Sequence, residues 1–258
     1  MRRSPIVTLA AVALAATAVV AGGQPAPAPE QDQVRVVGHG LTISEIPEAH
    51  LAALAAQPVD TACTDATYAV KTWKVSGTWT WLYNPEGAPA AVKDTALAAI
   101  TTAGDTVAKG VNRCGLAANF TTVYKYGGTS TVKPQVSADL TCTGNDGKSV
   151  SGWGALPPKV LAYTCTYFNS KNVVIASDML IDNVAYTWFT TKPDNCAGQL
   201  YDLETTMAHE RLHTAGLAHV DQTKNAAQTM TPASAPCDTS RRLLGAGDYA
   251  GLKSLAGK

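Results

Sequence analysis

Apolar and polar residues alternate in several stretches of the chain, and this is the pattern of strands that bury one face. Two such stretches predict strands, at residues 67–83 and 120–126, and two further strand-like runs lie at residues 159–168 and 172–181. An alanine-rich stretch between the first two has helical spacing instead and predicts a helix that packs on the sheet. It covers residues 88–115, with its apolar positions at Val92, Leu97, Ile100 and Val107.

Glycine-containing pairs and triplets separate these elements. Gly127 and Gly128 follow the second strand and predict a turn, and Asn145-Asp146-Gly147 predicts another. The stretch before the first long strand, residues 34–60, predicts a strand and a short helix after Pro47. The chain closes with the sequence GDYAGLKSLAGK, which predicts a short helix capped at Asp248.

Three of the five histidines lie within eleven positions, in the sequence HERLHTAGLAH. The preceding run has no proline, and Asp202 is placed to cap a helix that starts there. On that helix His209 and His213, four residues apart, lie on one face about 6 Å apart along the axis. Two imidazoles in this position are able to bind one metal ion.

Gly216 follows where the helix must end, because a glycine adopts the left-handed conformation that turns the chain back. The turn brings His219 to the same metal from another direction. Three neutral imidazoles leave a tetrahedral zinc ion one position for water, which is typical of a catalytic site. Glu210 is placed to take a proton from that water, and it is the predicted general base. A surface helix with chance histidines is the alternative.

These residues resemble a known family. HERLHTAGLAH resembles the HExxHxxGxxH element of the metzincin metallopeptidases, and QTMTPAS resembles their Met-turn. The resemblance implies three zinc ligands, a general base and an apolar floor under the metal. These are His209, His213 and His219 as ligands, Glu210 as base and Met230 as floor, with Gly216 as the supporting turn.

Within the metzincins the sequence is most similar to the matrixins, whose Met-turn also reads Met-x-Pro. The resemblance spans most of residues 66–258, although only the histidine motif and the Met-turn are specific to the family, and it implies an α+β fold. The expected fold is a metzincin-like zinc protease domain with a twisted mixed sheet, a packing helix, an active-site helix and a C-terminal helix after the Met-turn. An extended peptide is expected to pair with an exposed edge of this sheet, at residues 160–167.

Three departures from the family pattern are visible. Arg211 and Leu212 replace an apolar residue and a glycine inside HExxH, and Arg211 is expected to reach solvent or a carboxylate such as Glu204. No tyrosine stands two positions after Met230, so an extra tyrosine ligand is not expected. No cysteine-switch sequence precedes Cys63, so latency by thiol coordination has no support.

The N-terminus has two arginines, an apolar run from Ile6 to Val20 and then small residues, the order of a secretory signal peptide. We expect cleavage between Ala21 and Ala28; an uncleaved membrane anchor is the alternative. Three segments follow: a signal peptide at 1–23, a Pro/Ala-rich tether and N-terminal extension or pro-segment at 24–62, and the catalytic domain at 63–258. Histidines 39 and 50 lie singly in the second segment and are expected on the surface, without a role.

Six cysteines follow the predicted signal peptide, and an even number in an exported chain predicts three disulfides. No CxxC pair is present, so a zinc–thiolate site has little support. Sequence alone leaves many pairings open. Pairing of neighbours is the prediction: 63 with 114, 142 with 165 and 196 with 237.

The charge balance, with 20 basic and 20 acidic residues, gives no excess for binding nucleic acid. The predicted function is that of a secreted, monomeric zinc endopeptidase with polypeptide substrates and no membrane contact after cleavage. An exported binding protein with a structural zinc ion is the alternative, and a zinc hydrolase acting on other bonds is a third reading. Calcium binding stays open, because no EF-hand pattern is present.

Overall fold

The structure is a computed structural model that describes residues 33–44 and 60–256. The expected signal peptide, the helix after Pro47 and His50 lie outside the described residues. The strands are β1 (Arg35–Ile43), β2 (Ala69–Val70), β3 (Thr78–Tyr83), β4 (Val123–Thr129), β5 (Val150–Gly154), β6 (Val160–Phe168), β7 (Val174–Asp182), β8 (Thr187–Phe189), β9 (Leu200–Asp202), β10 (Leu217–Ala218) and β11 (Ala233–Ser234). The helices are α2 (Thr61–Thr64), α3 (Ala96–Lys109), α4 (Leu203–Ala215) and α5 (Ala246–Ala256).

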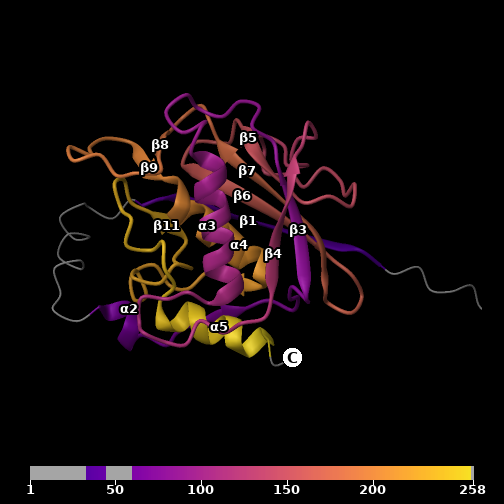
Figure 1. Cartoon of the computed structure of the whole chain (residues 1–258), viewed down its shortest axis with the longest axis vertical. Helices are drawn as coiled ribbons and strands as arrows, with labels where there is room; N and C mark the ends of the chain where they lie inside the picture. Colours follow the sequence, from indigo (N-terminus) through magenta and orange to yellow (C-terminus); the bar gives the residue numbers. More distant parts are fainter. Residues whose placement is uncertain (1–32, 45–59, 257–258) are drawn as a thin grey trace, which may run out of the picture. The chain divides into compact units, whose positions relative to one another are not determined.

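Seven strands form one mixed sheet in the order β11-β1-β6-β7-β5-β3-β4. Strand β6 is antiparallel to both of its neighbours, whereas β3, β4, β5 and β7 pair in parallel. Helices α3 and α4 lie against one face of this sheet (Figure 1). A mixed sheet with a packing helix, the histidine-bearing helix and a C-terminal helix is therefore confirmed.

In strand β3, alternate residues point into the core. Its inward residues Trp79, Trp81 and Tyr83 are buried, and the residues between them are exposed or half-buried. Strands β6 and β7 are buried along nearly their whole length, because a second apolar cluster covers their other face. Polar residues of these strands, such as Thr164 and Asp178, are therefore buried together with the apolar ones.

Helix α3 is shorter than the sequence pattern predicts. It covers Ala96–Lys109 rather than residues 88–115. A series of turns that starts near Pro89 leads into it, and Gly110 ends it in the left-handed conformation, with φ 72°. The apolar positions Val92, Ile100 and Val107 are buried as expected.

The turn predicted at Gly127 and Gly128 is wrong. Both residues lie inside β4, which continues to Thr129. The register between β3 and β4 shifts at this point, and Gly128 has φ 116°. The two glycines therefore accommodate a β-bulge rather than a chain reversal.

The three predicted disulfides are confirmed. Cys63 bonds to Cys114, Cys142 to Cys165 and Cys196 to Cys237, which leaves no free cysteine in the described part of the chain. Among the helices of the same part, none has the length and apolar character needed to cross a membrane.

Candidate metal centre

Specific residues determine both ends of helix α4. The Asp202 side chain accepts a hydrogen bond from the backbone N–H of Thr205 at 3.0 Å, which confirms Asp202 as the N-cap. Gly216 ends the helix with φ 108°. A side chain at this position would overlap the carbonyl oxygen of Trp73, so glycine is required for both its conformation and its size.

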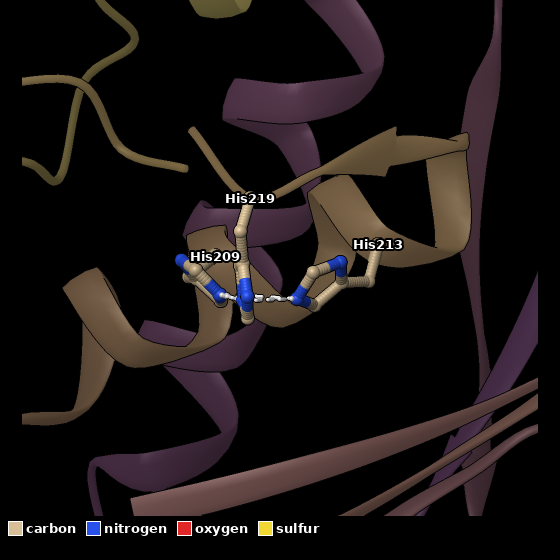
Figure 2. A group of neighbouring side chains, drawn as sticks. All are labelled: His209, His213 and His219. Atoms are coloured by element: carbon tan, nitrogen blue, oxygen red, sulfur yellow. Dashed lines mark hydrogen bonds between the residues drawn. The ribbon is translucent and has the colours of Figure 1, made fainter. Parts of the chain in front are cut away.

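The turn after α4 brings three histidines to one point (Figure 2). The Nε2 atoms of His209 and His213 lie 3.1 Å apart, and that of His219 lies 3.1 Å and 3.0 Å from them respectively. Zn–N bonds of roughly 2.0–2.1 Å place the nitrogens of a tetrahedral zinc site about 3.3 Å apart. The three imidazoles therefore have the spacing of a zinc site.

Backbone carbonyl groups orient two of these rings. The Nδ1 atom of His209 lies 2.7 Å from the carbonyl oxygen of Thr229, and Nδ1 of His213 lies 3.1 Å from that of Leu217. A carbonyl oxygen only accepts, so both Nδ1 atoms carry the proton and both Nε2 atoms present lone pairs. Lone pairs that converge at about 3 Å repel unless a cation lies between them, and the donor set thus fits a metal ion.

Burial keeps these imidazoles neutral. It lowers the pKa of His209 and of His213 well below the usual value, and it lowers the pKa of His219 to about 4. Neighbouring imidazoles lower the pKa of His209 and His213 further, while the nearby Lys71 acts on His219. Neutral rings are the form that binds metal at neutral pH.

Glu210, the predicted base, is fully buried beside the first histidine. Its Oε1 atom accepts a hydrogen bond from the backbone N–H of Leu41 at 3.1 Å, and its Oε2 atom accepts one from the Thr164 hydroxyl. Burial raises the pKa of Glu210 to about 8, and these two hydrogen bonds partly oppose the effect.

The segment that resembles a Met-turn is held by Asp248. Its carboxylate accepts from the backbone N–H groups of Thr229 at 2.7 Å, Met230 at 3.1 Å and Gly245 at 3.0 Å. Helix α5 starts at Ala246, so Asp248 lies in its first turn and is not the cap that the sequence pattern predicts. Because Thr229 also orients His209, Asp248 connects α5 to the histidine cluster. Met230 is buried, and its role as the floor remains a prediction.

Replacing Asp248 with alanine is expected to lower the free energy of unfolding by at least ~2 kcal/mol, because three buried N–H groups lose their acceptor and each such loss costs roughly 1–3 kcal/mol. Chemical denaturation monitored by tryptophan fluorescence measures this change. The control Asp105→Ala removes an exposed partner of Lys109 and should cost less than ~1 kcal/mol. Equal stability of the two variants would contradict the role of Asp248.

Arg211 lies neither in solvent nor beside a carboxylate, so both expected environments are wrong. Its side chain is fully buried, and its guanidinium carbon lies 4.9 Å from the ring centroid of Trp79 and 4.4 Å from that of Trp81. It donates one hydrogen bond to the Ser151 hydroxyl at 3.2 Å. Glu204 instead pairs with Arg242, at 3.5 Å. Cation–π contact replaces the ion pair, because two tryptophan rings of β3 lie against the guanidinium group.

His39 also departs from the expectation of a surface residue. Its ring stacks on that of His213 with 4.7 Å between centroids and meets the His219 ring edge-on at 6.4 Å. The residue lies on β1, more than 170 positions before these histidines in the sequence, so no local pattern indicates the contact. Nδ1 of His39 is buried and has no hydrogen-bond partner among the described residues.

Strand β6 covers the stretch where an exposed sheet edge is expected, and this expectation is wrong as well. The strand is paired on both sides, with β7 on one and β1 on the other. Strand β1 in turn pairs in parallel with β11, which lies directly after the Met230 segment.

No protein-family profile matches the chain, and no curated protein matches it. Among solved structures the chain is similar to metalloproteinase-II from Bacteroides fragilis, with 14% sequence identity and a TM-score of 0.40. The match covers 80% of this chain and 60% of that one.

Proposed function

We propose that this protein is a secreted zinc-dependent endopeptidase of the metzincin type, most similar to the matrixin-like group. One observation carries the proposal: the Nε2 atoms of three imidazoles converge within 3.1 Å of one another, and the carboxylate of Glu210 is adjacent on the same helix. A purely structural site needs no carboxylate at that position.

His209, His213 and His219 would hold the ion. When bound, zinc supplies a Lewis acid that makes water a stronger nucleophile and polarises a peptide carbonyl. Glu210 would accept the proton of the attacking water and deliver it to the leaving nitrogen. The contacts of both Nδ1 atoms with backbone carbonyls keep His209 and His213 in the tautomer that this arrangement needs.

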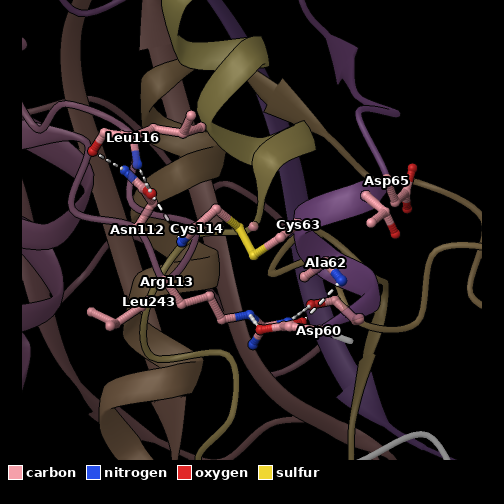
Figure 3. The surroundings of a disulfide bond; sticks show 12 residues. Asp60, Ala62, Cys63, Asp65, Asn112, Arg113, Cys114, Leu116 and Leu243 are labelled. Carbon is pink, nitrogen blue, oxygen red and sulfur yellow. Dashed lines mark hydrogen bonds and ion pairs between the residues drawn. A yellow bond between two sulfur atoms is a disulfide. The ribbon is translucent and has the colours of Figure 1, made fainter. Parts of the chain in front are cut away.

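The disulfides support export. The Cys63–Cys114 bond joins α2 to the loop after α3, beside the ion pair of Arg113 with Asp60 at 2.8 Å (Figure 3). Three disulfides in one chain are typical of proteins that fold in an oxidising compartment. We therefore propose that the N-terminal apolar run is a signal peptide, that residues 63–258 form the catalytic domain and that the enzyme acts outside the cytoplasm as a monomer.

The alternative, a binding protein with a structural zinc ion, is favoured by one observation. Glu210 is fully buried and engaged by Leu41 and Thr164, so it is shielded from solvent in this structure. Leu41, which covers the carboxylate on one side, belongs to strand β1.

Chelation separates the two functions. The purified protein should cleave an unfolded polypeptide such as reduced, alkylated lactalbumin, lose this activity in excess chelator and regain it on addition of zinc. Gel electrophoresis of the polypeptide measures the result. Cleavage that persists after the zinc has been removed would contradict a zinc-dependent mechanism.

A further inference from the structure

Strand β1 lies between β6 and β11 in the sheet. It runs antiparallel to β6 from the pair Arg35 and Phe168 to the pair Thr42 and Val160. On its other side Thr42 and Ile43 pair in parallel with β11. An extended polypeptide that paired with β6 beside the histidine cluster would need the position that β1 occupies. This position is called the slot.

The residues of β1 that face helix α4 contact the proposed catalytic groups directly. The backbone N–H of Leu41 donates to Oε1 of Glu210 at 3.1 Å, and its side chain is buried in the main core cluster. Two residues earlier, the His39 ring covers His213. The strand thus occupies the space beside both the base and a metal ligand.

The opposite face of β1 lies against the aromatic ring of Tyr163. A Cβ atom at Gly40 would lie 2.7 Å from the Tyr163 ring and 2.7 Å from the Ala162 carbonyl oxygen, and one at Gly38 would also meet the Tyr163 ring. Such contacts are too short, so β1 lies this close to β6 because both positions are glycine.

Little apolar burial holds β1 in place. Of its nine residues only Leu41 is fully buried, whereas all residues of β6 except Tyr163 are buried. Main-chain hydrogen bonds to β6 therefore supply much of its attachment, and another extended chain is able to make the same bonds.

We infer that β1 is an internal blocking strand, which occupies the polypeptide-binding slot beside the metal centre and must leave β6 before a substrate binds. The inference rests on the proposed function for its biological meaning, but the occupancy itself is testable without any cleavage. It also accounts for the burial of Glu210, since Leu41 covers the carboxylate only while β1 is in the slot.

Leu41→Asp should displace the strand, because it buries a second carboxylate beside Glu210 in an apolar site. Val36→Asp is the matched control, since it makes the same change at a position of β1 that is 45% exposed. Gly40→Val is a second, independent way to displace β1, through contact with the Tyr163 ring. Near-ultraviolet circular dichroism of the buried tryptophans checks that each variant stays folded.

Two measurements on the zinc-loaded full chain test whether β1 blocks the slot on β6. In the first, a fluorescent peptide with the sequence of residues 34–44 is mixed with each protein, and its anisotropy is followed in the first seconds. Removing the internal competitor should make the peptide bind at least ~10-fold more tightly to Leu41→Asp and Gly40→Val than to the wild type or Val36→Asp. In the second, hydrogen exchange at residues 160–168 should be faster in the two displaced variants.

The outcomes separate the inference from the proposed function. Tighter peptide binding without cleavage of any polypeptide supports the blocking strand and counts against the peptidase. Where Leu41→Asp is folded, unchanged peptide binding together with unchanged exchange in β6 overturns the blocking strand, even if the wild type cleaves polypeptides. If Leu41→Asp does not fold, the same two results for Gly40→Val decide in the same way.

Discussion

Alanine in place of His209, His213 or His219 is expected to lower the affinity for zinc by more than ~10²-fold, so that each purified variant contains almost none. The reason is that each residue contributes one of three converging Nε2 atoms, and changes to groups that merely support such ligands already cost roughly 10- to 100-fold. Elemental analysis of protein at micromolar concentration measures the zinc content.

His39→Ala is the matched control for these variants. It also removes an imidazole from the site, but His39 stacks on His213 and does not belong to the converging group. Its zinc content should equal that of the wild type. Full zinc in His219→Ala would show that the third ligand is another residue, and the metzincin proposal would then fail.

Glu210→Gln is expected to lower the rate of polypeptide hydrolysis by at least ~10²-fold, the typical effect of removing a general base. Glutamine keeps the size of the side chain and an oxygen that accepts from Leu41, but it does not take a proton from water. Zinc should stay bound, because Glu210 is not among the converging ligands. Hydrolysis rates and zinc content are measured on the same samples.

Glu204→Gln provides the comparison on the same helix. It makes the same chemical change at a residue that pairs with Arg242 and does not belong to the converging histidine group. Activity close to that of the wild type is expected. Equal losses of activity in the two variants would mean that the helix, rather than the Glu210 carboxylate, is responsible.

The histidine cluster is predictable from the sequence because the information that specifies it is local. His209, Gly216 and His219 lie within eleven positions, and helix geometry together with one left-handed glycine is enough to bring the imidazoles together. The disulfides were predictable for a similar reason, since each of them joins cysteines that are neighbours in the list of six along the chain.

The sequence does not indicate features that depend on distant partners. Leu41 reaches Glu210 across 169 positions, and Asp248 binds the Met230 segment across 18, so periodicity in the sequence indicates neither contact. The charge of Arg211 predicts solvent or a carboxylate beside it, yet its neighbours on β3 are two tryptophan rings. The sequence pattern does not predict strand β5, because two of its five residues are glycine and glycine weakens a strand pattern.

The most direct test of the peptidase proposal is mass spectrometry of an unfolded polypeptide after incubation with the zinc-loaded protein. The wild type and Leu41→Asp should both generate fragments with new amino and carboxyl termini, faster for Leu41→Asp, and the double variant Leu41→Asp/Glu210→Gln should generate almost none. If the wild type and Leu41→Asp both carry a full complement of zinc and leave the polypeptide intact, the ion is structural and the binding-protein function replaces the peptidase.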